Sequence, residues 1–71
     1  MDESLVRSRW FTTDELADLL GVDSSSLRRW RTSRPVQGPA FVRVSDRVVK
    51  YSERDVERWL LARRHDPLEA A

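Results

Sequence analysis

The chain of 71 residues contains no cysteine, a single histidine and only two glycines, and its formal net charge is only +1. Without cysteine, disulfide bonds and thiolate metal sites are excluded. His65 has no metal-ligating residue at ligand spacing, so the sequence predicts no metal and no other cofactor. No apolar run approaches the roughly 20 residues of a membrane span, and the charged first residues do not resemble a signal sequence. We therefore expect a cytoplasmic protein that does not contact membranes.

The residue inventory also disfavours catalysis. The carboxylates at 14–18 and 53–57 fall in the first turns of expected helices, where they offset the helix dipole. The serines at 24–26 have no general base nearby in the sequence, and the chain has no glycine-rich phosphate loop. We therefore expect that the protein is not an enzyme.

The small net charge conceals a strong segregation of charge along the chain. Residues 1–23 carry two bases and six acids, whereas residues 24–51 carry seven bases and one acid. A polyanion would be attracted to the basic segment, while the acidic remainder limits unspecific binding and self-association. The pattern indicates one basic surface between residues 24 and 51. A charged surface that is merely solvated is the alternative.

Two short helices separated by a Gly-Val break predict a helix-turn-helix. Thr12 is expected to cap the first helix with Glu15 as its reciprocal partner, and Gly21 ends that helix. Asp23 is expected to cap the second helix. At about 100° per residue, the face of this second helix opposite its apolar stripe is polar and basic, as a DNA-reading helix requires. The predicted recognition-helix residues are Ser24, Ser25, Arg28, Arg29, Arg31, Thr32 and Arg34.

The segment after the second helix predicts a loop and then a hairpin. The prolines and glycine of Pro35–Pro39 interrupt helical structure. Phe41–Val44 and Val48–Tyr51 are β-branched and aromatic runs separated by a Ser-Asp-Arg turn, with Val49 and Tyr51 expected to point inward. Such a hairpin would form a wing on the minor groove or its phosphates, and a hairpin that only covers the core is the alternative. The predicted DNA-binding residues of the wing are Arg43, Arg47 and Lys50.

A last helix completes the expected domain. Ser52 is predicted to cap it with Asp55 at the reciprocal position, and residues 65–71 are predicted to form a flexible tail. We expect one domain over residues 1–71, ordered from about 9 to 64, mainly α with a small β-hairpin: a winged helix-turn-helix in the order helix, helix, two-stranded wing, helix. The aromatic residues lie on apolar faces, which favours core packing over base stacking. The predicted core is Trp10, Leu16, Leu19, Leu20, Leu27, Trp30, Phe41, Val49, Tyr51, Val56, Trp59 and Leu60.

The order of these elements is similar to the MerR-like winged-helix family. The run GPAFVRVSDRVVKYSERDVERWL resembles the small excisionases, or recombination directionality factors, of actinobacterial temperate phages. The likeness covers about residues 10–64. Its more specific pieces are Thr12-Thr13, Leu27-Arg28-Arg29-Trp30, Gly38-Pro39 before Phe41, and Asp55 with Trp59-Leu60.

The resemblance implies a protein that binds repeated duplex sites near a phage attachment site, bends the DNA and directs an integrase toward excision. Its partners would be double-stranded DNA, neighbouring copies on the DNA and a phage integrase, in the cytoplasm of a bacterial host and on the nucleoid when bound. Because twelve residues follow Trp59, where full MerR-type regulators have a long dimerisation helix, we expect a monomer in the absence of DNA. A small MerR-like transcriptional regulator is one alternative, and a protein-binding adaptor module is an alternative of another class.

Overall fold

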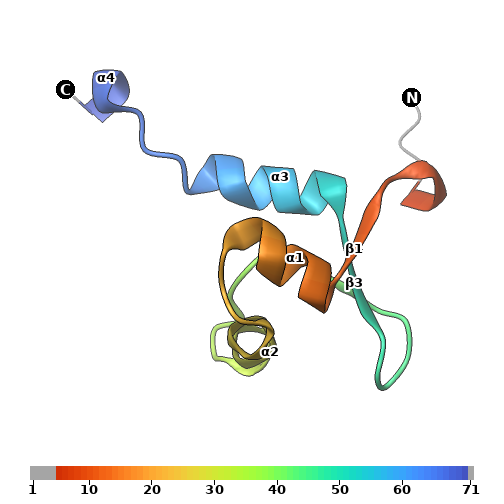
Figure 1. Ribbon diagram of the computed structural model, residues 1–71. Coiled ribbons are helices and arrows are strands. Elements are labelled where there is room, and N and C mark those ends of the chain that lie inside the picture. The colour runs from red at the N-terminus through yellow and green to blue at the C-terminus, as the bar shows by residue number, and fades with distance from the viewer. Residues whose placement is uncertain (1–4, 71) are drawn as a thin grey trace.

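The computed structural model describes residues 5–70 and has the predicted winged helix-turn-helix architecture (Figure 1). The described residues form helices α1, α2 and α3 and a small antiparallel sheet, whose hairpin lies between α2 and α3 in the chain. The elements in chain order are η1 (Leu5–Arg7), β1 (Trp10–Thr12), α1 (Thr13–Leu20), α2 (Ser24–Thr32), β2 (Val42–Arg43), β3 (Val49–Ser52), α3 (Glu53–Ala62) and α4 (Pro67–Ala70).

Helix α1 begins and ends at the residues that its sequence indicates. The Thr12 hydroxyl accepts a hydrogen bond from the Glu15 backbone N–H at 3.0 Å, and a Glu15 carboxylate oxygen accepts one from the Thr12 N–H at 2.9 Å. This reciprocal capping box satisfies two N–H groups that have no partner inside the helix. Gly21 ends the helix at φ 72°, in the left-handed region that glycine adopts without steric cost. The predicted boundaries of α1 are therefore confirmed.

The N-terminal cap residues of α2 and α3 are the predicted ones, but not all of the expected capping hydrogen bonds are present. Asp23 is the N-terminal cap of α2, but its side chain makes no capping hydrogen bond. At α3 the Ser52 hydroxyl accepts a hydrogen bond from the Asp55 N–H at 3.1 Å, as expected. The Asp55 carboxylate lies 3.9 Å from a guanidinium nitrogen of Arg58, one helical turn further on.

The sheet has a third strand that the sequence analysis did not predict. Strand β1 pairs antiparallel with β3, so that Phe11 lies opposite Tyr51, and the strand order is β1-β3-β2. A three-residue strand is too short for an alternation of apolar and polar residues to identify it. It forms because β3 would otherwise leave an unpaired edge. The predicted two-stranded wing is therefore the outer part of a three-stranded sheet.

The hairpin itself is confirmed, but β2 is two residues shorter than predicted and β3 lies one residue further along the chain. Beyond the two residues of β2, the chain is held by a hydrogen bond of 2.8 Å from the Val44 N–H to the Val48 carbonyl oxygen. The alternation in β3 is as expected, because Val49 and Tyr51 are buried while Lys50 is half-buried. The hairpin thus contributes one face to the core and presents the other outward.

The core lies where the sheet meets one stripe of each helix. Its buried residues are Phe11, Leu16, Ala17, Leu27, Val49, Tyr51 and Val56, with Leu20, Val22, Trp30 and Phe41 packed against them. Trp59 is half-buried and packs on Trp30, with ring centres 6.0 Å apart. Trp30 and Trp59 therefore form an aromatic pair at the edge of this core.

Three predicted core residues lie elsewhere. Leu19 is 57% exposed and Leu60 is 43% exposed. The sheet is narrow and covers only one stripe of α1 and α3, which leaves the apolar residues on their flanks in solvent. Trp10 is half-buried on the outer face of the sheet, because strand alternation turns its neighbour Phe11 toward the core. The prediction of a core position is wrong for these three residues.

The loop between α2 and the wing is anchored on Trp30. The Gln37 N–H donates a hydrogen bond of 3.0 Å to the Trp30 carbonyl oxygen. Gly38 follows at φ 88°, and a Cβ atom at this position would lie 3.1 Å from Cε3 of Trp30. Pro39 is fully buried. The residues from 35 to 39 are thus a loop, as predicted, and glycine is needed at 38 for both backbone conformation and space.

Figure 1 shows that α2 and the hairpin lie on the same side of the molecule, with α3 on the opposite side and α1 between them. Helix α4 is a single turn set apart beyond the end of α3. The side chain of Asp66 accepts hydrogen bonds from the Leu68 N–H at 3.0 Å and from Arg64 at 3.1 Å. The flexibility of residues 65–71 and the ordered limits of 9–64 remain predictions.

Candidate nucleic-acid interface

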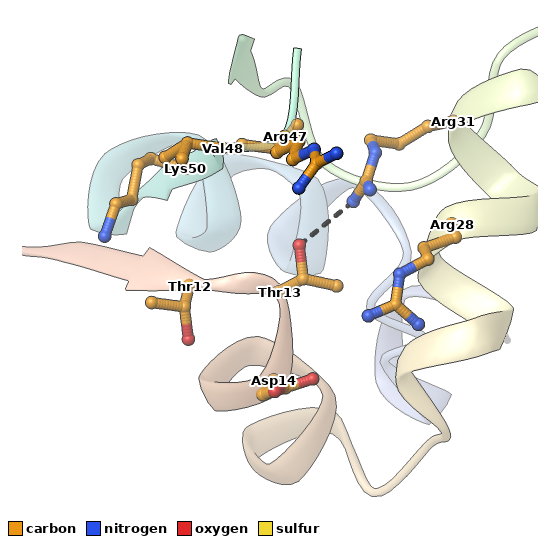
Figure 2. A pocket seen from close by; sticks show the side chains of 9 residues that line it. Thr12, Thr13, Asp14, Arg28, Arg31, Arg47, Val48 and Lys50 are labelled. Carbon is orange, nitrogen blue, oxygen red and sulfur yellow. Dashed lines mark hydrogen bonds between the residues drawn. The ribbon is translucent and has the colours of Figure 1, made fainter. Parts of the chain in front are cut away.

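A groove of about 350 Å³ separates α2 from the hairpin, and the first residues of α1 close its end (Figure 2). Four cationic side chains line it, two from α2 and two from the hairpin: Arg28, Arg31, Arg47 and Lys50. Asp14 is the one carboxylate among the lining residues. The remaining lining residues are Thr12, Thr13, Val48 and Val49. The groove lining is therefore predominantly positive.

Arg28 is an exposed cation of this groove. Its guanidinium donates a weak hydrogen bond of 3.4 Å to the Ser24 hydroxyl one turn earlier in α2. In Figure 2 the guanidinium points from α2 toward the start of α1. An exposed hydrogen bond of this length contributes little stability, because water competes for both groups. Arg28 can therefore exchange the Ser24 hydroxyl for an anionic ligand.

Arg31 lies in the same groove but is held by the protein. One guanidinium nitrogen, Nη1, donates to the Thr13 hydroxyl at 3.1 Å and to the Tyr51 hydroxyl at 2.9 Å. The guanidinium carbon also lies 5.8 Å from the ring centre of Phe41. Arg31 is one of the predicted recognition-helix residues, and the structure turns its guanidinium toward α1 and the sheet.

The hairpin contributes two of its three predicted residues to the groove. Arg47, in the turn, reaches toward α2, and Lys50 lines the outer end (Figure 2). Arg43 is exposed on β2 and lies opposite Val49, outside the groove. The hairpin therefore presents cations in two directions.

The remaining predicted residues of α2 lie outside this groove. Arg29 is exposed and donates a hydrogen bond of 3.3 Å to the Ser26 hydroxyl. Thr32 bonds to the Arg29 carbonyl oxygen at 3.2 Å, and with Arg34 it lines a neighbouring recess that also includes Arg31. Ser24 is half-buried and Ser25 is exposed, both in the first turn of α2. The structure thus gathers four of the ten predicted residues into one groove.

Sequence reasoning missed the residues of α1 that close the groove. Thr13 and Asp14 directly follow the cap residue Thr12, and the sequence explained them as parts of a helix start. Their position beside Arg28 and Arg47 depends on how α1 packs against α2 and the sheet, which leaves no local pattern in the sequence. Asp14 offsets part of the groove's positive charge.

A charged cap lies next to the groove at the start of α1. The hydrogen bond from the Thr12 backbone N–H lowers the pKa of Glu15. Smaller contributions in the same direction come from the Thr12 hydroxyl and from the charges of Lys50 and Arg9. The Glu15 carboxylate therefore stays ionised at neutral pH and keeps α1 capped beside the positive lining.

The cationic lining of this groove is suited to an anionic ligand. Among residues 5–70 no group of three or more potential metal-ligating side chains is present, and no helix is long and apolar enough to cross a membrane. Guanidinium and ammonium groups bind phosphates and guanine edges, and two elements that project from one side can hold a duplex at two points. The fold and the groove define a winged helix-turn-helix DNA-binding module.

Comparison with known proteins identifies the family. A family model described as a helix-turn-helix domain matches residues 10–64, from β1 through the end of α3. The chain therefore belongs to this DNA-binding family, which includes excisionase-like proteins and is typically non-enzymatic. No curated protein and no solved structure matches the chain. Family membership indicates sequence-specific binding of double-stranded DNA.

Proposed function

We propose that this protein binds specific duplex sites, bends the DNA and acts as a phage excisionase that directs integrase-mediated recombination toward excision. The observation that carries the DNA-binding part is the convergence of Arg28 and Arg31 from α2 with Arg47 and Lys50 from the hairpin on one groove. The excisionase part rests on the sequence resemblance over residues 10–64 and on a family that includes excisionase-like proteins.

The proposed docking places α2 in the major groove and the hairpin against the adjacent minor groove. Helix α2 has nine residues, and the overall diameter of an α-helix, about 10 to 12 Å with its side chains, fits a major groove about 12 Å wide. Arg28 faces base edges, where a guanidinium can donate two hydrogen bonds to guanine. Arg47 and Lys50 contact phosphates of the strand that runs between the two elements.

Bending follows from holding the duplex at two points with charge on one side. Cations from α2 and the hairpin neutralise phosphates on the face that meets the protein, which lowers the cost of curving the DNA toward it. A single module of this kind buries roughly 600 to 1,000 Å² against DNA. One copy therefore binds modestly, and copies on repeated sites gain affinity from contacts with their neighbours. The protein is a monomer away from DNA in this proposal, and an integrase is its partner at the attachment site.

The bending activity is tested by selecting bound duplexes from a random library and permuting the recovered site along a DNA fragment. We expect the mobility of the complex in gel shifts to be lowest when the site lies at the fragment centre. Mobility that does not depend on the position of the site contradicts bending.

The excisionase role is tested in a reconstituted reaction with a phage integrase and its attachment-site DNA. We expect footprints on repeated sites near the attachment site, faster excision and slower insertion. A footprint confined to a promoter, with no effect on recombination, would instead identify a transcriptional regulator. An absence of any duplex binding, with binding to an acidic protein, would identify an adaptor.

The proposed docking predicts different effects on DNA binding for substitutions in α2 and in the hairpin. Arg28→Ala should lower specific binding by roughly 1 to 3 kcal/mol, because it removes a base contact. Arg47→Ala should weaken binding evenly across sequences and reduce the salt slope by about 0.9, the loss of one phosphate contact. Arg58→Ala, on α3, is the matched control, because Arg58 is exposed and outside the groove. Equal footprints for wild type and Arg28→Ala would contradict the placement of α2.

A further inference from the structure

The two hydrogen bonds of Arg31 connect three elements that must act together on DNA. Arg31 belongs to α2, while its partners Thr13 and Tyr51 belong to α1 and β3. Nitrogen Nη1 carries two hydrogens, and the two hydroxyl groups account for both of them. Hydrogen bonds from a charged donor are stronger than neutral ones, and partial burial shields them from water.

The partner on the sheet side is inaccessible to any ligand. Tyr51 is only 1% exposed and is not part of the groove lining. Its ring packs in the core, with the Phe41 ring centre 6.1 Å away, and its hydroxyl bonds to Arg31. Any effect of this hydroxyl on DNA binding must therefore act through Arg31 and the elements around it.

The orientation of α2 relative to the hairpin depends strongly on such side-chain links. Among the described elements, the backbone of α2 lies closest to α1, and it makes no comparably extensive approach to β3. In Figure 2 the Arg31 side chain spans this space, with Arg28 on one side and Arg47 on the other. A site that binds a rigid duplex at two points needs both sets of cations in place to within about half an ångström.

We propose that Arg31 is a positioning residue that fixes the recognition helix relative to the wing, rather than a residue that reads DNA through Nη1. This inference rests on the proposed DNA binding. It adds that the hydrogen bonds of Arg31 set the distance between the base contacts of α2 and the phosphate contacts of the hairpin. The hydrogen bond to Tyr51 holds α2 against the sheet, so that Arg28 and Arg47 reach one duplex at the same time.

The substitution Tyr51→Phe tests the proposal because it removes the buried acceptor and changes neither charge nor the exposed surface. If Nη1 of Arg31 contacted DNA directly, losing the tyrosine hydroxyl would free a donor, and affinity would stay constant or rise. If Arg31 positions α2, affinity falls. The expected loss is roughly three- to tenfold, typical of a residue that acts without touching the ligand. The salt slope falls by less than the 0.9 expected for complete loss of the Arg47 contact, because that contact is weakened and not removed.

The control for stability is Val56→Ala. Val56 is 3% exposed on α3 and has no part in the Arg31 contacts, so its truncation destabilises the domain without altering the groove. We expect Val56→Ala to bind the selected duplex with wild-type affinity at a temperature where both proteins are folded. Should Tyr51→Phe fail to fold, Thr13→Val removes the other acceptor and should give the same direction of change.

A second readout separates positioning from a general structural role. In the wild-type background Arg47→Ala removes a phosphate contact, whereas in the Tyr51→Phe background the wing is already displaced and the same substitution should cost less affinity. An equal cost of Arg47→Ala in both backgrounds overturns the proposal, as does an unchanged affinity of Tyr51→Phe. If the wild-type protein itself binds no duplex, the proposed function fails. Duplex binding that Tyr51→Phe leaves intact refutes only the role of Arg31.

Discussion

The loop that joins the recognition helix to the wing depends on glycine at position 38, and Gly38→Ala tests this dependence. At φ 88° an added Cβ atom is strained by backbone conformation, and it would also lie 3.1 Å from the Trp30 ring. The left-handed conformation costs an L-residue about 1 to 2 kcal/mol, of which the reduced entropy of the unfolded chain returns about 0.4 to 1 kcal/mol. The contact with Trp30 adds about 1 kcal/mol, at the lower end of the cost of overpacking.

Gly21→Ala is the matched control for this experiment. Gly21 also has a positive φ of 72°, but an added Cβ atom there would meet nothing within 4 Å. We therefore expect Gly38→Ala to lower the free energy of unfolding by about 2 kcal/mol and Gly21→Ala by about 1 kcal/mol. Since each kcal/mol shifts Tm by about 4 to 8 °C in a domain of this size, thermal melts followed by circular dichroism separate the two variants. Equal losses would refute the argument that Trp30 closes the space above Gly38.

Two further predictions concern the start of α1. Asp14→Asn removes the one carboxylate of the groove lining and should raise duplex affinity about two- to fivefold at low salt. The control Asp18→Asn lies outside the lining and should not raise the affinity in this way. Equal effects of the two substitutions in binding titrations would show that the groove is not the contact. The pKa of Glu15 is lowered in the folded protein, chiefly by the Thr12 N–H, so its ionised form stabilises the fold above the ordinary carboxyl range, and this contribution is lost as pH falls through the lowered pKa. In urea titrations Glu15→Gln should therefore lose less stability than wild type between neutral and acidic pH, and parallel losses would contradict the capping box.

Local signals in the sequence predicted the helices and the hairpin well. Local residues mark both ends of α1: the capping box of Thr12 and Glu15 marks its start, and Gly21 marks its end. These two signals can be found without knowledge of the fold. The alternation of Val49 and Tyr51 likewise identified the inner face of the wing. These features are set by neighbours one to four residues apart.

Features that depend on tertiary contacts could not be predicted in this way. Strand β1 exists because β3 offers it an edge, and its three residues turn Trp10 away from the core. Leu19 and Leu60 match the apolar periods of their helices but lie beyond the reach of a narrow sheet. The sequence grouped Arg31 with the DNA-contacting residues of the second helix, and only the packing of α2 beside Thr13 and Tyr51 reveals its inward contacts.

The central claim is that the groove between α2 and the hairpin is the surface that meets DNA. Titration of isotope-labelled protein with a selected duplex, followed by amide chemical shifts in NMR spectra, tests this most directly. The account predicts that the largest shifts occur at the start of α1, along α2 and in the hairpin from Val42 to Lys50. Largest shifts on α3 and the Leu19 flank of α1, with the groove residues unmoved, would contradict it.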